Sequence, residues 1–276
     1  MAAPKAVLLG LFLTATIGVS ASAKDSQKNS ADDDSGSSIA GFVSAGIGWV
    51  PDYQGSSHYK IRPYFEGRIN KGNYYLRLVG PTLLFNVVDS SMFHAGPVIG
   101  LRRSRNHVKG PAVAAMKKID YSMTGGGFVE YEHVAKDPRS AERVTLYVQN
   151  DLVGENSGWT VTARGVVRRP VNFVDRGLIA SVEVDTVWAD GTYMNTYFGV
   201  SGPDALASRL PDYRASPGFK SVGAALSLDQ FLSRTWSVGL RFHYSRLTGA
   251  AADSPITRLT GSRNQYFFGL VVGYVI

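Results

Sequence analysis

Apolar and polar side chains alternate along this chain in short segments that begin near residue 40 and run to the last residue. In the final segment, Gln265 to Ile276, every second side chain from Tyr266 onward is large and apolar, and those between are mostly small. Lipid covers such a face in a membrane barrel. The segment is typical of a closing barrel strand, and the last strand of a soluble sandwich is the alternative.

The alternation continues upstream, and it is clearest over 59–68, where Tyr59, Ile61 and Phe65 share a face opposite charged residues. Turn residues separate the segments. Gly80-Pro81 divides 74–88 in two, because proline is poorly tolerated inside a paired strand. The predicted strands are 40–50, 59–68, 74–79, 82–88, 92–103, 119–134, 143–152, 159–169, 177–188, 219–229, 235–247 and 265–276.

Connection lengths favour twelve strands over the eleven that result without a Gly80-Pro81 turn. With twelve strands and a periplasmic start, the short connections near 70–73, 89–91, 135–142, 170–176 and 230–234 fall on the periplasmic side. The long connections 51–58, 104–118, 189–218 and 248–264 then all fall outside, as in bacterial barrels. The pattern predicts an all-β fold, a transmembrane antiparallel β-barrel of twelve strands over 40–276.

The first 39 residues predict export. Lys5 is followed by an apolar run and by the small residues Ala21-Ser22-Ala23, which is typical of a signal peptide over 1–23 that is cleaved after Ala23. Residues 24–39 are polar and lack aromatic residues, so we expect a disordered periplasmic tail. No later apolar stretch reaches the length of a membrane helix.

Composition excludes several functional classes. The 29 Lys and Arg exceed the 22 Asp and Glu, for a formal net charge of +7, but they form no block that would track phosphates, so no nucleic-acid partner is expected. The modest excess suits outer-membrane lipid and lipopolysaccharide. There is no cysteine, which excludes thiol catalysis and thiolate metal sites.

The polar faces of the strands carry charges of both signs. Paired charges could fill the lumen, or rings of charge could line a narrow pore, and the mixture of signs along single strands favours the filled lumen. The predicted lumen charges are Lys60, Arg62, Glu66, Arg68, Glu130, Glu132, Arg164, Arg168, Glu183, Asp185 and Arg241.

No constellation predicts catalysis, a cofactor or a metal. The five histidines lack the spacing of a zinc site, and no G-x-S-x-G is present. His243 and Ser245 share a strand face, but side chains at that spacing stand about 7 Å apart. Glu130 and Glu132 have arginine-bearing strands nearby, which favours salt bridges over acid-base chemistry.

Three motifs in the predicted outer loops carry a resemblance. The stretch Pro51 to Ser56 (PDYQGS) resembles the MipA/OmpV family of outer-membrane proteins. So does the stretch Tyr193 to Val200 (YMNTYFGV), which continues through Ala205, Ser208, Leu210, Tyr213 and Gly218. The third match is Ser245-Arg246-Leu247, Ala252 to Ile256 (ADSPI) and the closing Gly269-Leu270 with Tyr274. Two positions depart from the family pattern: Ile276 replaces the usual final phenylalanine, and Arg209 follows Ser208 where a small residue is usual. The motif residues are Pro51, Asp52, Tyr53, Gly55, Ser56, Tyr197, Phe198, Gly199, Val200, Ser208, Tyr213, Ser254 and Pro255.

The resemblance implies a non-enzymatic protein of the bacterial outer membrane. It implies a scaffold that joins a lytic transglycosylase to a bifunctional murein synthase, and a narrow channel or an adhesin is the alternative. The expected contact surface is periplasmic, formed by the 24–39 tail and by turns such as Lys136 to Arg139. The motif residues themselves read as loop-shaping, with Asp52 accepting from backbone amides and Gly55 at positive φ. The aromatic residues of the 189–218 loop would fill the barrel mouth.

Overall fold

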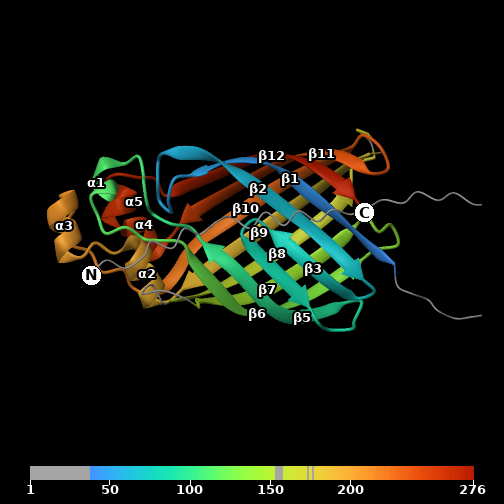
Figure 1. The fold of residues 1–276 in the computed structure, drawn as a ribbon, viewed down its shortest axis with the longest axis horizontal. Helices are drawn as coiled ribbons and strands as arrows, with labels where there is room; N and C mark the ends of the chain where they lie inside the picture. The colour runs from blue at the N-terminus through green and yellow to red at the C-terminus, as the bar shows by residue number, and fades with distance from the viewer. Residues whose placement is uncertain (1–37, 153–157, 173, 176) are drawn as a thin grey trace, which may run out of the picture. The chain divides into compact units, whose positions relative to one another are not determined.

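The computed structural model describes residues 38–152, 158–172, 174–175 and 177–276. They form a closed sheet in which every strand pairs antiparallel with its sequence neighbours and the first strand pairs with the last (Figure 1). The expected twelve-stranded antiparallel barrel is confirmed. Its strands are β1 (Ile39–Pro51), β2 (Tyr59–Lys71), β3 (Tyr74–Val79), β4 (Thr82–Asn86), β5 (Phe93–Arg102), β6 (Ser122–Val134), β7 (Ala141–Asp151), β8 (Trp159–Pro170), β9 (Leu178–Ala189), β10 (Gly218–Phe231), β11 (Trp236–Leu247) and β12 (Asn264–Val275).

Five short helices lie in the long connections and gather at one end of the barrel (Figure 1). We call this the loop end, and the opposite end, which carries the short connections, the turn end. The four long connections 52–58, 103–121, 190–217 and 248–263 form what we call the loop cap. The helices are α1 (Pro111–Ala114), α2 (Gly191–Phe198), α3 (Gly202–Ser208), α4 (Gly249–Asp253) and α5 (Pro255–Arg258).

Closure depends on eight register pairs between β1 and β12, from Phe42 opposite Val275 to Trp49 opposite Phe268. The amide of Ile276 donates to the carbonyl of Gly41 at 2.9 Å, so the last residue extends the seam beyond the strand. Without this seam, both edge strands would expose unpaired backbone groups, which lipid cannot satisfy. The seam therefore makes the barrel compatible with a bilayer.

The outward face is apolar along all of β12, as the sequence predicts. The six alternating side chains from Tyr266 to Ile276 are each between 37% and 55% exposed. Aromatic residues also sit on this face near both strand ends, and such paired girdles mark the two interfaces of a membrane barrel. The loop-end girdle includes Trp49, Tyr59, Trp159, Trp188, Tyr244 and Tyr266, and the turn-end girdle includes Tyr74, Phe93, Tyr131, Trp236 and Tyr274.

Gly80 makes the turn between β3 and β4 with φ of +55°, which confirms the division of 74–88 into two strands. Several predicted boundaries were wrong by two or three residues, and side-chain contacts explain two of them. The segment 82–88 ends as a strand at Asn86, because the Asn86 side chain bonds both the amide and the carbonyl of Val88. The segment 119–134 begins as a strand only at Ser122, because Ile119 is buried within the loop cap.

The main buried cores lie at the loop end. One packs Tyr193, Met194, Tyr197 and Phe198 of α2 against residues of β9, β11 and α4. A second joins Tyr53 to side chains of three other loops. A third, smaller core lies within the barrel wall around Tyr75 and Phe128. The loops thus hold a core of their own, which fixes them relative to one another.

The signal peptide over 1–23 lies outside the described residues, as does the 24–39 tail up to residue 37; β1 begins at Ile39. At Arg209, the non-family residue occupies the left-handed region with φ of 61° at the end of α3, where a small residue costs less. Within the described residues, no helix is both long and apolar enough to span a bilayer.

The seam yields a first test at Gly46. A Cβ added there would lie 1.9 Å from the carbonyl oxygen of Leu270 on β12. We therefore expect Gly46→Ala to force the seam apart, at a cost of about 1–3 kcal/mol, and to lower the refolded fraction measured by heat-modifiable mobility in gels. Gly127→Ala is the control, because its nearest atom would be 3.7 Å away. Equal refolding of the two variants would show that the seam tolerates a side chain there.

Candidate functional site

The largest group of lumen charges lies near the turn end, around two glutamates of β6. Glu130 accepts from Arg77 of β3 at 2.5 Å, and Glu132 accepts from Arg68 of β2 at 2.7 Å. Arg143 of β7 lies 3.3 Å from Glu132. Because β2 and β3 are not neighbours of β6, these bonds cross the lumen and bridge strands that do not pair.

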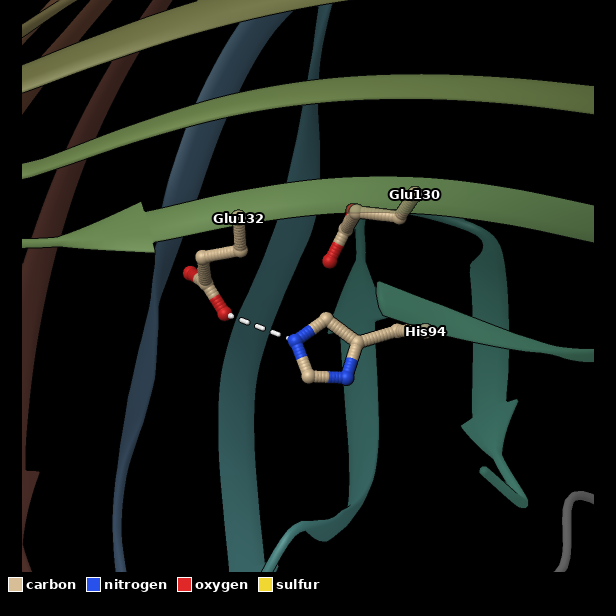
Figure 2. A group of neighbouring side chains, drawn as sticks. All are labelled: His94, Glu130 and Glu132. Carbon is tan, nitrogen blue, oxygen red and sulfur yellow. Dashed lines mark ion pairs between the residues drawn. The ribbon is translucent and has the colours of Figure 1, made fainter. Parts of the chain in front are cut away.

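His94 lies beside the same glutamates and makes a group of three possible metal ligands (Figure 2). Its Nε2 is 3.6 Å from Glu132. Three guanidiniums already neutralise the two carboxylates, and Glu130 also accepts hydrogen bonds from Tyr75 and Thr145. A divalent cation would displace these donors and face three positive charges, so the donor set does not fit a metal.

A second group of charges lies nearer the middle of the barrel. Arg241 of β11 donates to Glu66 of β2 at 2.9 Å and to Asp229 of β10 at 2.7 Å. Arg164 lies 2.9 Å from Glu183 on the neighbouring strand. His243 lies 2.8 Å from Asp185. Among the described strand residues that face the lumen, every carboxylate has a cationic or histidine partner.

The remaining predicted lumen charges have other surroundings. Arg168 donates to the carbonyls of Pro138 and Arg139 and so holds the 135–140 turn. Lys60 forms an ion pair with Asp52 at the loop end. Arg62 has no hydrogen bond or ion pair to the described residues.

Sequence analysis missed several partners of these charges. Arg77 shares a face with Tyr75 on β3, and that alternation was a usable signal in a strand of only six residues. Arg143 and Asp229 were also not singled out. Arg102 and Asp151 pair at 2.8 Å near the loop end. Each is the last residue of its strand, where the alternation does not indicate whether a side chain faces the lumen or the lipid.

The loop motifs, far apart in sequence, meet in the loop cap. The Ser254 hydroxyl donates to the carbonyl of Phe198 at 2.6 Å, which joins the second and third motifs. Ser56 forms a β-bridge with Gly261, and Val200 forms one with Tyr213. Each of these contacts uses a backbone group, so they shape the loops.

Local geometry explains the identity of several motif residues. Gly55 has φ of +91° and donates its amide to Gln265 at 3.1 Å. Asp52 is buried, pairs with Lys60 and accepts from the amide of Lys109 at 2.8 Å. Four further motif residues hold loop geometry: Gly199 ends α2, Ser208 accepts from the amide of Leu210, Pro255 begins α5 and Pro51 ends β1.

The tyrosines of α2 point toward polar groups beneath the loop cap. Tyr193 donates to Gln54 at 2.9 Å and lies under the guanidinium of Arg102, 4.7 Å from its ring centroid. Burial raises the pKa of Tyr197, so its hydroxyl stays protonated. Burial lowers the pKa of Arg105, whose side chain reaches the carbonyl of Tyr197 at 3.3 Å. The arrangement is a buried polar network at the barrel mouth.

Among the described residues, no hydroxyl is hydrogen-bonded to a histidine ring. The polar contacts of the histidine ring nitrogens in that part of the chain are to Asn86, Glu132 and Asp185. Ser245 shares a strand face with His243, but the His243 ring bonds to Asp185 instead. The chemistry that the lumen supports is charge pairing.

The charge pairs across the lumen make a stability prediction. Arg77→Met leaves the fully buried Glu130 without its bidentate partner, and we expect a loss of about 3 kcal/mol in the free energy of unfolding. Adding Glu130→Gln to that variant should restore part of it. The control is Arg169→Met, which breaks a half-exposed pair with Glu142 and should cost no more than about 1 kcal/mol. Urea titration of the refolded barrel measures all three, and equal losses for Arg77→Met and Arg169→Met would refute the buried role.

Comparison with known proteins adds to this geometry. Among proteins with curated descriptions, none matches the sequence. Among solved structures, an outer membrane channel of Pseudomonas putida F1 is similar, with 11% identity, a TM-score of 0.44, and coverage of 90% of this chain and 100% of that one. OmpT of Vibrio cholerae is similar at 9% identity and a TM-score of 0.39, over 87% of this chain and 97% of that one. At such identities these names say nothing about what this barrel does.

A family model described as MltA-interacting protein MipA matches residues 43–276. The match begins inside β1, includes the three loop motifs and runs to the last residue. It therefore covers the whole barrel apart from the first residues of one strand, and the chain belongs to the MipA family.

Proposed function

We propose that this protein is a non-enzymatic scaffold of the bacterial outer membrane that binds murein-remodelling enzymes. The observation that carries the proposal is the family match over 43–276, whose description names an interaction with MltA, a lytic transglycosylase. The apolar outward face and the two aromatic girdles support a position in a lipid bilayer. The loop end would then face lipopolysaccharide and the cell exterior.

The proposed contact surface is the turn end, which faces the periplasm where murein lies. The 135–140 turn presents Lys136, Asp137 and Arg139 to solvent, and Asp137 and Arg139 pair at 2.8 Å. Hydrogen bonds from Arg139 lower the pKa of Asp137, so the pair stays charged at neutral pH. Because Arg168 holds this turn from inside the barrel, the charges are presented on a fixed backbone.

The lumen charges support a scaffold over a channel. Arg68 and Arg77 reach Glu132 and Glu130 across two or more intervening strands, and Arg241 reaches Glu66 in the same way. Each bond places side chains across the lumen and ties up the charges that an ion would need. The adhesin alternative has no comparable support, since the loop motifs bond to one another. A bifunctional murein synthase remains the second proposed partner, bound together with the transglycosylase.

The test neutralises the 135–140 turn in the full-length barrel. We expect Lys136→Ser, Asp137→Ser and Arg139→Ser together to weaken binding of a purified MltA-type transglycosylase by about tenfold or more, measured by biolayer interferometry on detergent-solubilised protein.

The matched control removes the same three residue types from the opposite end. Lys118→Ser, Asp212→Ser and Arg214→Ser alter exposed residues of the loop cap. This variant should bind the transglycosylase as the unmodified barrel does. If the turn variant binds normally, or if the control loses as much, the turn end is not the contact surface.

A further inference from the structure

A cavity of about 60 Å³ lies beneath the loop cap, and its walls carry the buried Arg105, the exposed Arg103 and no carboxylate. The polar groups that matter are Arg103 and Arg105, Ser104, Gln54 and Tyr197. A water needs roughly 10–15 Å³ of such space. The cavity therefore has room for a group of about five heavy atoms.

Three buried polar atoms around this cavity find no hydrogen-bond partner among the described residues. They are the Nε of Arg105 and the hydroxyls of Tyr53 and Tyr197. All three side chains are more than nine-tenths buried, at 6%, 5% and 4% exposure. The other two nitrogens of Arg105 reach the carbonyls of Tyr197 and Lys117, each at 3.3 Å, so the guanidinium is held in place while its Nε stays unused. A buried donor without an acceptor destabilises the fold, and a bound acceptor would satisfy it.

Two further cations nearby lack a carboxylate partner in the described part of the chain. Arg103 lines the cavity, and Arg62 lies close enough to repel its charge. The neighbouring acids are already engaged. Asp52 pairs with Lys60, Asp151 pairs with Arg102, and Asp204 accepts from the amide of Lys117. The charge of the residues that line the cavity is therefore positive, and Asp204 offsets part of the charge of Arg105 from outside it.

From this geometry we propose that the cavity binds a small oxyanion of the phosphate type, held by the guanidiniums of Arg103 and Arg105 and by the hydroxyl of Tyr197. Arginine presents a planar set of donors that matches such oxygens, and the tyrosine hydroxyl adds a neutral donor. A phosphate group has five heavy atoms, which the cavity accommodates. A cation would meet two guanidiniums there and no acid, and an apolar group would leave the buried donors unused.

The site has a route from the loop end. Arg105 also lines a wide open cleft of about 1200 Å³, whose walls include Lys117, Lys118 and Arg214 as well as Asp204 and Asp212. The cations outnumber the acids along this cleft, which favours the approach of anions. The ligand could be a free phosphate or the phosphate of a glycolipid headgroup. Neither the cavity nor the cleft includes a residue of the turn end. The proposal of an anion site and the proposal of an enzyme-binding surface can therefore be tested independently.

The test uses the full-length barrel in detergent and a phosphate-free chloride buffer, with inorganic phosphate as the probe. Isothermal titration calorimetry should show saturable binding at one site. Arg103→Gln and Tyr197→Phe should each weaken it by about tenfold, because each removes a hydrogen bond to a charged group. Arg105 is left intact, since its bonds to two carbonyls hold the loops.

Arg234→Gln is the matched control, because it makes the same change at an exposed position of the turn end. It should leave phosphate binding unchanged, and heat-modifiable mobility should confirm that all variants are folded. Glucosamine 1-phosphate distinguishes the sources: tighter binding than phosphate would point to a glycolipid headgroup, and failure to bind would point to the free ion. Absence of saturable phosphate binding, or equal binding by Arg103→Gln, Tyr197→Phe and the unmodified barrel, would overturn the proposal.

Discussion

The pairing of β1 with β12 is the constraint on which the rest of this structure depends. A bilayer offers no hydrogen bonds to a strand edge, so the sheet must close before the apolar outer face can be buried in lipid. The eight register pairs and the bond from Ile276 to Gly41 achieve that closure. Closure also sets which inward side chains face one another across the lumen.

The inward charges follow from that geometry. Alternation along each strand points a charge inward, but only the closed sheet brings Arg68 to Glu132 or Glu66 to Arg241. Buried acids of this kind are stable only with partners, and the described lumen carboxylates all have one. At the loop end, by contrast, cations lack partners. Arg62 and Arg103 have no carboxylate partner among the described residues, and the unused donors of Arg105 and Tyr197 lie close by. The two ends of the barrel thus differ in charge balance, and the proposed anion site follows from that difference.

Much of the fold was predictable because a period of two survives in nearly every strand. The strand count, the outward face of β12 and the turn at Gly80 all follow from alternation and turn chemistry. The strand boundaries were wrong where a side chain replaced a hydrogen bond between strands, as at Asn86, or where a residue is buried in a core of the loop cap, as at Ile119. The helices of the loop cap were not predicted, because segments of four to eight residues are too short to show a helical period. The partners of the lumen charges, and the cavity beneath the cap, depend on contacts between segments up to 175 residues apart, which alternation along one strand does not encode.

The central claim is that side-chain pairs across the lumen block the passage of ions, as expected of a scaffold and not of a channel. Single-barrel recording in planar bilayers tests it most directly, comparing the unmodified protein with a variant carrying Arg68→Ala and Arg241→Ala. The account predicts no lasting conductance steps from the unmodified barrel, and steps from the variant in which the links across the lumen are removed. Long-lived ohmic steps from the unmodified barrel, unchanged in the variant, would contradict it and make the protein a channel.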